Sequence, residues 1–64
     1  MPDPALHELF HQLNNQLGVI LANAELLEHR LTDEKHKLRA GQIVSGALEA
    51  ISIAKRIRQV STAD

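Results

Sequence analysis

Residues 6–31, LHELFHQLNNQLGVILANAELLEHRL, decide the fold of this chain. Apolar residues recur in this stretch at alternating spacings of four and three positions, and they form two interleaved rows. The first row has Leu6, Leu13, Ile20 and Leu27, and the second has Phe10, Leu17, Ala24 and Leu31. An unbroken alternation of this kind is typical of a helix that packs along other helices in a coiled coil or bundle. The apolar stripe is widened towards a bundle face by Leu9, Leu21 and Leu26.

The start of this helix is marked by two residues that suit a helix N-terminus. We expect the first helix to span about residues 4–31. Asp3 can accept hydrogen bonds from the free N–H groups of the first turn. Pro4 fits the first helical position, because the N–H group that proline lacks has no partner there in any case.

A polar segment follows and predicts a short turn at about residues 32–34. Thr32 or Asp33 can cap a second helix, which we expect over about residues 34–61. Its apolar and small residues also fall into rows: Ile43, Ala50 and Ile57 in one, and Ala40, Ala47, Ala54 and Ser61 in the other. The side expected to be buried is broadened by Val44, Leu48, Ile51 and Val60.

Two helices joined by so short a connection are antiparallel neighbours, so the fold class is all-α. A single hairpin would leave much of both apolar stripes in water. A chain of 64 residues without cysteine cannot compensate with disulfides. Pairing two hairpins about a two-fold axis solves the problem, and we therefore expect a homodimeric four-helix bundle with residues 1–64 as one unit.

Composition excludes several classes of function. The net charge of −1 gives no strong field for nucleic acid or for an anionic membrane. The longest apolar run is far too short to span a bilayer. The N-terminus has no basic region followed by an apolar one, so we expect no signal peptide and a cytoplasmic location.

The segment FHQLNNQLGVI at residues 10–20, followed by NAELL at 23–27, resembles the H-box of histidine kinases. In that box a phosphoacceptor histidine precedes a residue that is usually acidic, then Leu, then Asn or Arg, then Asn or Thr, then Pro or a substitute. An Ile and a Glu-Leu-Leu follow on the same helix. The resemblance covers the whole chain, since the dimerisation and histidine-phosphotransfer domain of that family is a helical hairpin. It implies that His11 is the phosphoacceptor in His–Asp phosphotransfer of two-component signal transduction.

The same resemblance implies the partners. They are a second copy of the chain, the receiver domain of a response regulator and the ATP-binding domain of a histidine kinase. We expect no cofactor and no metal in this chain, because ATP and Mg²⁺ would be bound by the separate catalytic domain or by the receiver. The chain is either a domain of a kinase, which is a transferase, or a free-standing phosphotransfer or dimerisation module.

Residue spacing supports the same assignment for His11. It follows the core position Phe10, so it lies on the flank of the apolar stripe, where a ring nitrogen is accessible while the helix stays packed. Asn15 lies one turn further on the same face, where its amide can orient water or bind a phosphoryl oxygen. Counting back from the turn places Lys55 and Arg58 at roughly the level of His11, where cations favour a phosphoryl group or an acidic partner.

One departure from the family pattern bears directly on the chemistry. Gln12 stands where the family has Glu or Asp, a residue that accepts or orients a proton of the histidine during transfer from ATP. A neutral amide can form hydrogen bonds but cannot accept that proton. We therefore expect autophosphorylation to be weakened or lost, whereas exchange of phosphate with a receiver aspartate can persist.

Plainer interpretations stand beside these. His11 and Asn15 can be ordinary surface residues, and Lys55 and Arg58 can be solvated charges that complement a helix C-terminus. The chain can also be a degenerate structural dimeriser, in which Gln12 marks lost chemistry.

A zinc-protease motif occupies the same place in the sequence. Residues 7–11, HELFH, match H-E-x-x-H, in which two histidines bind zinc and the glutamate acts as a base. We reject that function, because such an enzyme needs a substrate cleft and a third ligand carried by other structure. A zinc-dependent hairpin would also lose its helicity on treatment with a chelator.

Overall fold

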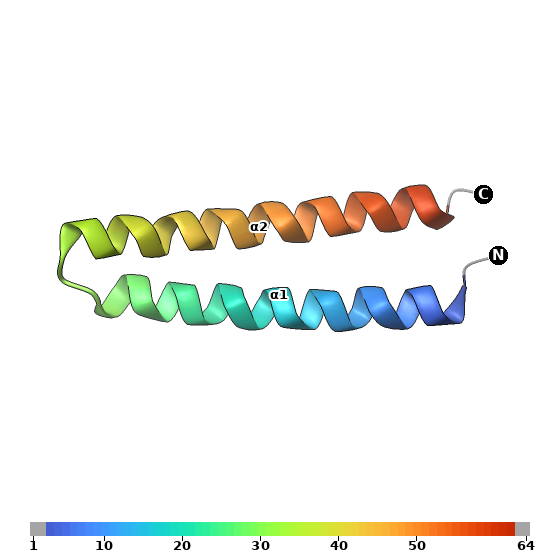
Figure 1. The fold of residues 1–64 in the computed structure, drawn as a ribbon, viewed down its shortest axis with the longest axis horizontal. Helices are drawn as coiled ribbons and strands as arrows, with labels where there is room; N and C mark the ends of the chain where they lie inside the picture. The colour runs from blue at the N-terminus through green and yellow to red at the C-terminus, as the bar shows by residue number, and fades with distance from the viewer. Residues whose placement is uncertain (1–2, 63–64) are drawn as a thin grey trace.

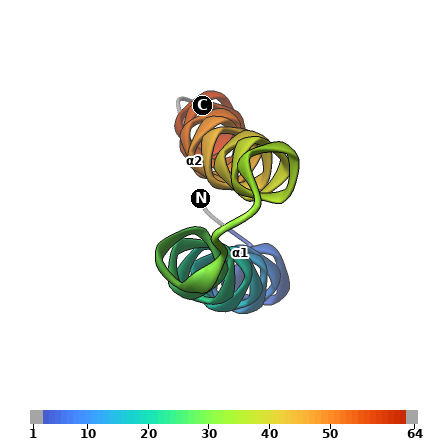
Figure 2. The ribbon, with the colours of Figure 1, turned by 90° about the vertical axis from the view of Figure 1, so that its left-hand side faces the viewer.

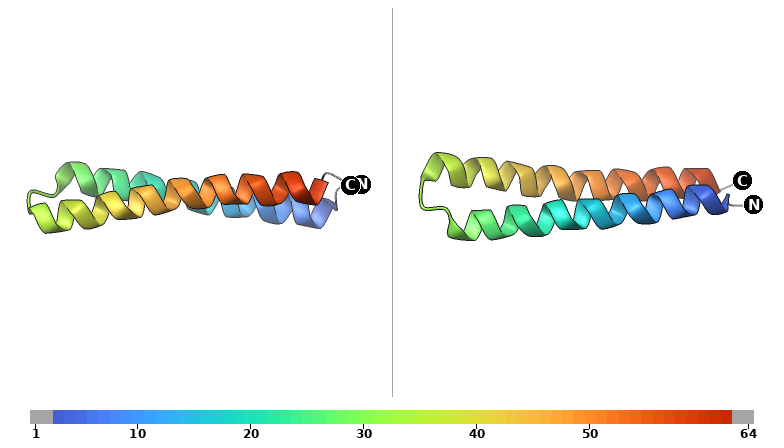
Figure 3. Two further views of the ribbon diagram at one scale, coloured as in Figure 1. Left: turned by 90° about the horizontal axis from the view of Figure 1, so that it is seen from above. Right: turned by 60° about the horizontal axis from the view of Figure 1, so that its bottom comes forward.

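The computed structural model describes residues 3–62, and for residues 61 and 62 it describes the backbone alone. Two antiparallel helices, α1 (Pro4–Arg30) and α2 (Glu34–Thr62), make up the hairpin and lie side by side along their length (Figures 1 and 3). Viewed from the turn, the connection passes directly from one helix to the other (Figure 2). The all-α hairpin is therefore confirmed. Residues 1, 2, 63 and 64 of the predicted unit lie outside the described residues.

The start of α1 follows from the residues that precede it. The backbone N–H of Ala5 donates to Oδ1 of Asp3 at 2.9 Å, and Pro4 occupies the first turn. The N–H of His7 donates to the carbonyl oxygen of Asp3 at 2.9 Å, which closes the first helical turn. The predicted roles of Asp3 and Pro4 at the N-terminus of α1 are confirmed.

The turn consists of residues 31–33, so α1 ends one residue earlier than predicted and α2 continues one residue further. Leu31 has left the helix, with φ −74° and ψ 138°, although its N–H still donates to the carbonyl oxygen of Leu27. Of the two candidate caps for α2, Asp33 fills the role. Its Oδ1 accepts from the N–H groups of Lys35 at 2.9 Å and His36 at 3.2 Å.

The contact between the helices is built on small residues. Among the side chains that the structure describes, the most buried are four alanines with 3–6% exposure: Ala24, Ala40, Ala47 and Ala54. Three of them recur every seven residues along α2, and they face the row of α1 that contains the half-buried Phe10 and Leu17. Short side chains allow the helices to approach closely, but a core of alanine removes little apolar surface from water. The side chain of Ser61, expected to continue the α2 row, lies outside the description.

The other apolar row of each helix has no neighbour in the hairpin. Its larger members are 37–51% exposed: Leu6, Leu13, Ile20 and Leu27 on α1, and Ile43 and Ile57 on α2. Of the residues expected to broaden the buried side, Leu21, Val44 and Ile51 are half-buried. The hairpin leaves four others exposed, namely Leu9, Leu26, Leu48 and Val60, and their burial in a dimeric bundle stays a prediction. They are exposed because each helix has one neighbour, which covers only a narrow stripe.

Neither of the described helices combines the length and the apolar character that a membrane span requires.

Candidate functional site

His11 lies on α1, near the end of the hairpin opposite the turn, and its side chain is exposed. Successive residues of an α-helix are about 100° apart around the axis. His11 therefore lies about 100° from Phe10 in one direction, and Leu13 lies about 60° from Phe10 in the other. His11 and the exposed apolar row that contains Leu13 are on nearly opposite sides of α1.

The ring of His11 stacks with the ring of His7, one helical turn earlier. The ring centroids are 6.1 Å apart and the ring planes are inclined by 20°. Both side chains are exposed. Sequence reasoning considered His7 only within the zinc-protease motif. The spacing of four residues places both side chains on one face of α1, whereas the ring contact itself depends on their rotamers.

The two polar residues assigned to His11 from the sequence lie beside it in the structure. Gln12 and Asn15 are both exposed. Asn15 lies about 40° round the helix from His11 and one turn further along, so it presents its amide on the same face. This placement allows the amide of Asn15 to meet a group bound to His11.

Asn14 is a residue that the sequence analysis did not assign to the site. It is half-buried, and its Oδ1 has no hydrogen-bond partner among the residues that the structure describes. It follows Phe10 by four positions, so it projects towards α2, and that spacing was the signal for its burial.

Three cations of α2, namely Lys55, Arg56 and Arg58, lie on the part of that helix that runs beside the start of α1 (Figure 1). His11 is 19 residues from the end of α1 at Arg30, and Lys55 is 21 residues from the start of α2 at Glu34. At a rise of about 1.5 Å per residue, the two are about 29 Å and about 32 Å from the turn. Arg58 is about 36 Å from it on the same count.

Lys55 also lies on the same side of the hairpin as His11. It follows the buried Ala54 as His11 follows Phe10. In antiparallel helices, the residue after a contact position projects to the same side in both. Arg56, which is next along α2, projects elsewhere and forms an exposed ion pair with Glu49 at 3.9 Å. Of the cations singled out from the sequence, Lys55 therefore best matches the level of His11.

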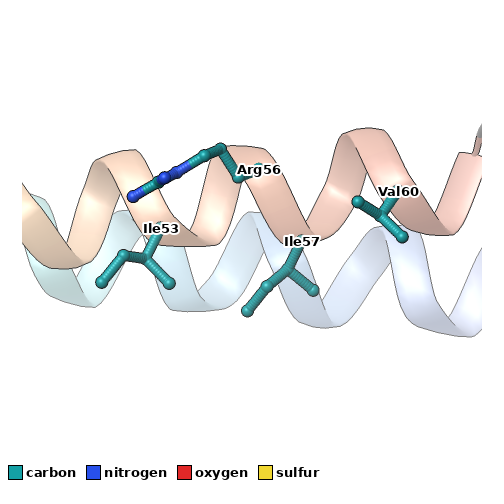
Figure 4. Close-up of a pocket in the computed structure, with 4 residues that line it drawn as sticks. All are labelled: Ile53, Arg56, Ile57 and Val60. Atoms are coloured by element: carbon teal, nitrogen blue, oxygen red, sulfur yellow. The ribbon is translucent and has the colours of Figure 1, made fainter.

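A shallow apolar groove runs along α2 on the side away from Lys55. It is lined by Ile53, Arg56, Ile57 and Val60. Figure 4 shows Ile53, Ile57 and Val60 projecting from one side of the helix, with the stem of Arg56 next to them. The groove belongs to the same exposed face as the row of Ile43 and Ile57.

The histidines at the turn are separate from this site. The Nδ1 atom of His36 is 3.9 Å from Oδ1 of Asp33, and both side chains are exposed. Within residues 3–62 there is no group of three or more His, Cys, Asp or Glu side chains able to hold a metal ion.

Comparison with models of known protein families matched none of them. Comparisons with curated proteins and with solved structures likewise gave no significant match.

Proposed function

We propose that this chain is the dimerisation and phosphoacceptor domain of a two-component sensor histidine kinase, with His11 as the phosphoacceptor. The observation that carries the proposal is the placement of His11 relative to the exposed apolar rows. The rows lie on one side of the hairpin, and His11 with Lys55 lies on the other. A second copy can therefore cover the apolar face and leave His11 open to a large protein that donates or accepts phosphate.

The hairpin needs a second copy because its own core buries little apolar surface. The hairpin buries four alanines, and six large aliphatic side chains of the two outer rows remain about half exposed. Exposed apolar patches of this extent mark sites of association. Rows with heptad spacing are self-complementary when two hairpins meet about a two-fold axis, which gives a four-helix bundle.

The proposed chemistry is transfer of one phosphoryl group to and from an imidazole nitrogen. The ring nitrogen of His11 that carries the lone pair attacks phosphorus, the bond from phosphorus to the donor oxygen breaks, and the proton on the other ring nitrogen is released. The ammonium group of Lys55 favours the negative charge of the phosphoryl oxygens. Asn15 can donate hydrogen bonds to the same oxygens.

Gln12 is the residue that distinguishes two possible reactions of His11, phosphate transfer from ATP and phosphate exchange with a receiver aspartate. Its amide cannot take the proton that an acidic residue would take during transfer from ATP. The domain would therefore exchange phosphate with a receiver aspartate more readily than it accepts phosphate from ATP. ATP and Mg²⁺ belong to the separate ATP-binding domain and to the receiver in this proposal.

The presence of Gln12 also supports a second candidate function, that of a purely structural dimeriser. If the acidic residue was lost together with the chemistry, the bundle serves only to join two copies of the chain. This structural dimeriser would have the same apolar face and the same solution mass, and it would carry no phosphate.

Incubation with phosphoramidate separates the two functions. Phosphoramidate transfers its phosphoryl group to imidazole nitrogen and releases ammonia, so no kinase domain is needed. All four histidines are exposed, and we expect Lys55 and Asn15 to favour transfer to His11 over the other three. We expect one phosphate on the chain by intact mass spectrometry, lost in His11→Gln and retained in His29→Gln, a control with an exposed histidine near the turn. A folded dimer that takes up no phosphate, or that loses none in His11→Gln, would leave the structural dimeriser as the function.

A further inference from the structure

The stacked rings of His7 and His11 form a pair that the proposed phosphotransfer does not use. Both are exposed side chains on consecutive turns of α1, and their rings are 6.1 Å apart and nearly parallel. The helix fixes the separation of their backbones on one face of α1, so the two rings can meet without any change in the backbone. A pair of imidazoles held in this way is a potential chelating group.

We propose that His7 and His11 together bind one divalent transition-metal ion of the class that prefers imidazole nitrogen, such as Zn²⁺ or Cu²⁺. Imidazole suits these ions better than it suits Mg²⁺ or Ca²⁺, which prefer oxygen ligands. Each neutral imidazole has one nitrogen with a free lone pair, so the pair supplies two ligands. The sequence alone led us to expect no metal here, and the ring geometry is the observation that changes this.

The two rings must move closer and change orientation before they can share one ion. Zinc–nitrogen bonds of about 2.0–2.1 Å at a tetrahedral angle place the centroids of two ligating rings about 5 Å apart. The observed separation of 6.1 Å must therefore close by about 1 Å. The nearly parallel rings must also turn until one in-plane lone pair of each points at the same ion, and both changes can come from χ1 and χ2 rotation of the two exposed side chains. The backbone of α1 does not need to move.

The neighbouring charges determine how strong the site is. The carboxylate of Asp3 lies one turn before His7, but its Oδ1 already accepts from the N–H of Ala5. Lys55 lies at the level of His11 on the same side and opposes a second cation. The other coordination positions are left to water, so the ion is exchangeable and is not required for folding. This distinguishes the pair from a zinc-protease centre and from a structural zinc site.

The inference does not depend on the phosphoacceptor function. If both hold, the metal ion and the phosphoryl group exclude each other, because each requires the lone pair of an imidazole nitrogen of His11. A metal-loaded hairpin would then be unable to accept phosphate.

A zinc titration of the full chain, followed by NMR of the histidine ring protons and by calorimetry, tests the inference. We expect one ion per chain, with the ring signals of His7 and His11 shifting together and those of His29 and His36 shifting less. His7→Gln should weaken binding at least about tenfold, because the second ligand is then lost from an intramolecular pair. His29→Gln is the matched control and should bind as tightly as the unmodified chain.

Two results would overturn the inference. One is equal shifts at all four histidines, and the other is an unchanged affinity in His7→Gln with its circular dichroism intact. Phosphoramidate treatment of His7→Gln without metal tests the phosphoacceptor role separately. His11 should still take up phosphate in this variant, whether or not the metal-binding inference holds.

Discussion

Truncation of Leu13 to alanine tests whether a second copy covers the exposed apolar face. Leu13 is 45% exposed in the hairpin. Complete burial of a leucine side chain contributes about 1.5–3 kcal/mol, so the exposed share is about 0.7–1.4 kcal/mol in each chain. Both copies carry the substitution, so the free energy of dimerisation should weaken by about 1.4–2.8 kcal/mol. The dissociation constant should therefore rise about 10- to 100-fold.

Sedimentation equilibrium over a range of concentrations measures that constant. Leu48→Ala is the control, because Leu48 is also a leucine and is 53% exposed. It follows Ala47 on the side of the hairpin that carries His11, so its loss should change the dissociation constant less than about twofold. Equal weakening by both substitutions would refute the assignment of the dimer face. A folded monomer at micromolar concentration would refute the dimer itself.

Three further substitutions test the hairpin by chemical denaturation at equal protein concentration. Asp33→Ala should lower the free energy of unfolding by about 1 kcal/mol, because two N–H groups of α2 lose their acceptor; an unchanged value would contradict the cap. Ala47→Leu should lower it by about 1–3 kcal/mol, since the larger side chain must force apart helices that meet at a buried alanine, and a more stable variant would refute that packing. Gly18→Ala should raise it by about 0.5–1 kcal/mol, because a Cβ atom there meets nothing within 4 Å and alanine favours the helix, whereas a loss would show that a second copy approaches Gly18.

The helices and their caps could be predicted from the sequence, because heptad spacing and N-terminal residues such as Asp3 act locally. The choice between the two rows of α1 could not. Both rows have the same spacing, and the choice depends on which side of α2 allows the closer approach. The alanines at seven-residue intervals on α2 determine which row of α1 packs against them. These contacts join residues that are far apart in the sequence.

Parts of the candidate site could also be predicted from the sequence, and other parts could not. The flanking position of His11 follows from its place after Phe10, and the level of Lys55 follows from the turn, which lies within a residue or so of its predicted position. The burial of Asn14 was missed, because an amide is expected to face water and only the neighbouring helix covers it. The ring contact between His7 and His11 depends on side-chain rotamers, which spacing alone does not determine.

Transfer of phosphate from His11 to a receiver aspartate is the measurement that tests the central claim most directly. The chain is first phosphorylated with phosphoramidate, freed of reagent and mixed with purified receiver domains and Mg²⁺. We predict that phosphate leaves His11 and appears on at least one receiver, and that His11→Gln delivers none. Phosphate that stays on His11 with every receiver encoded by the same genome would contradict the assignment of this hairpin to His–Asp phosphotransfer.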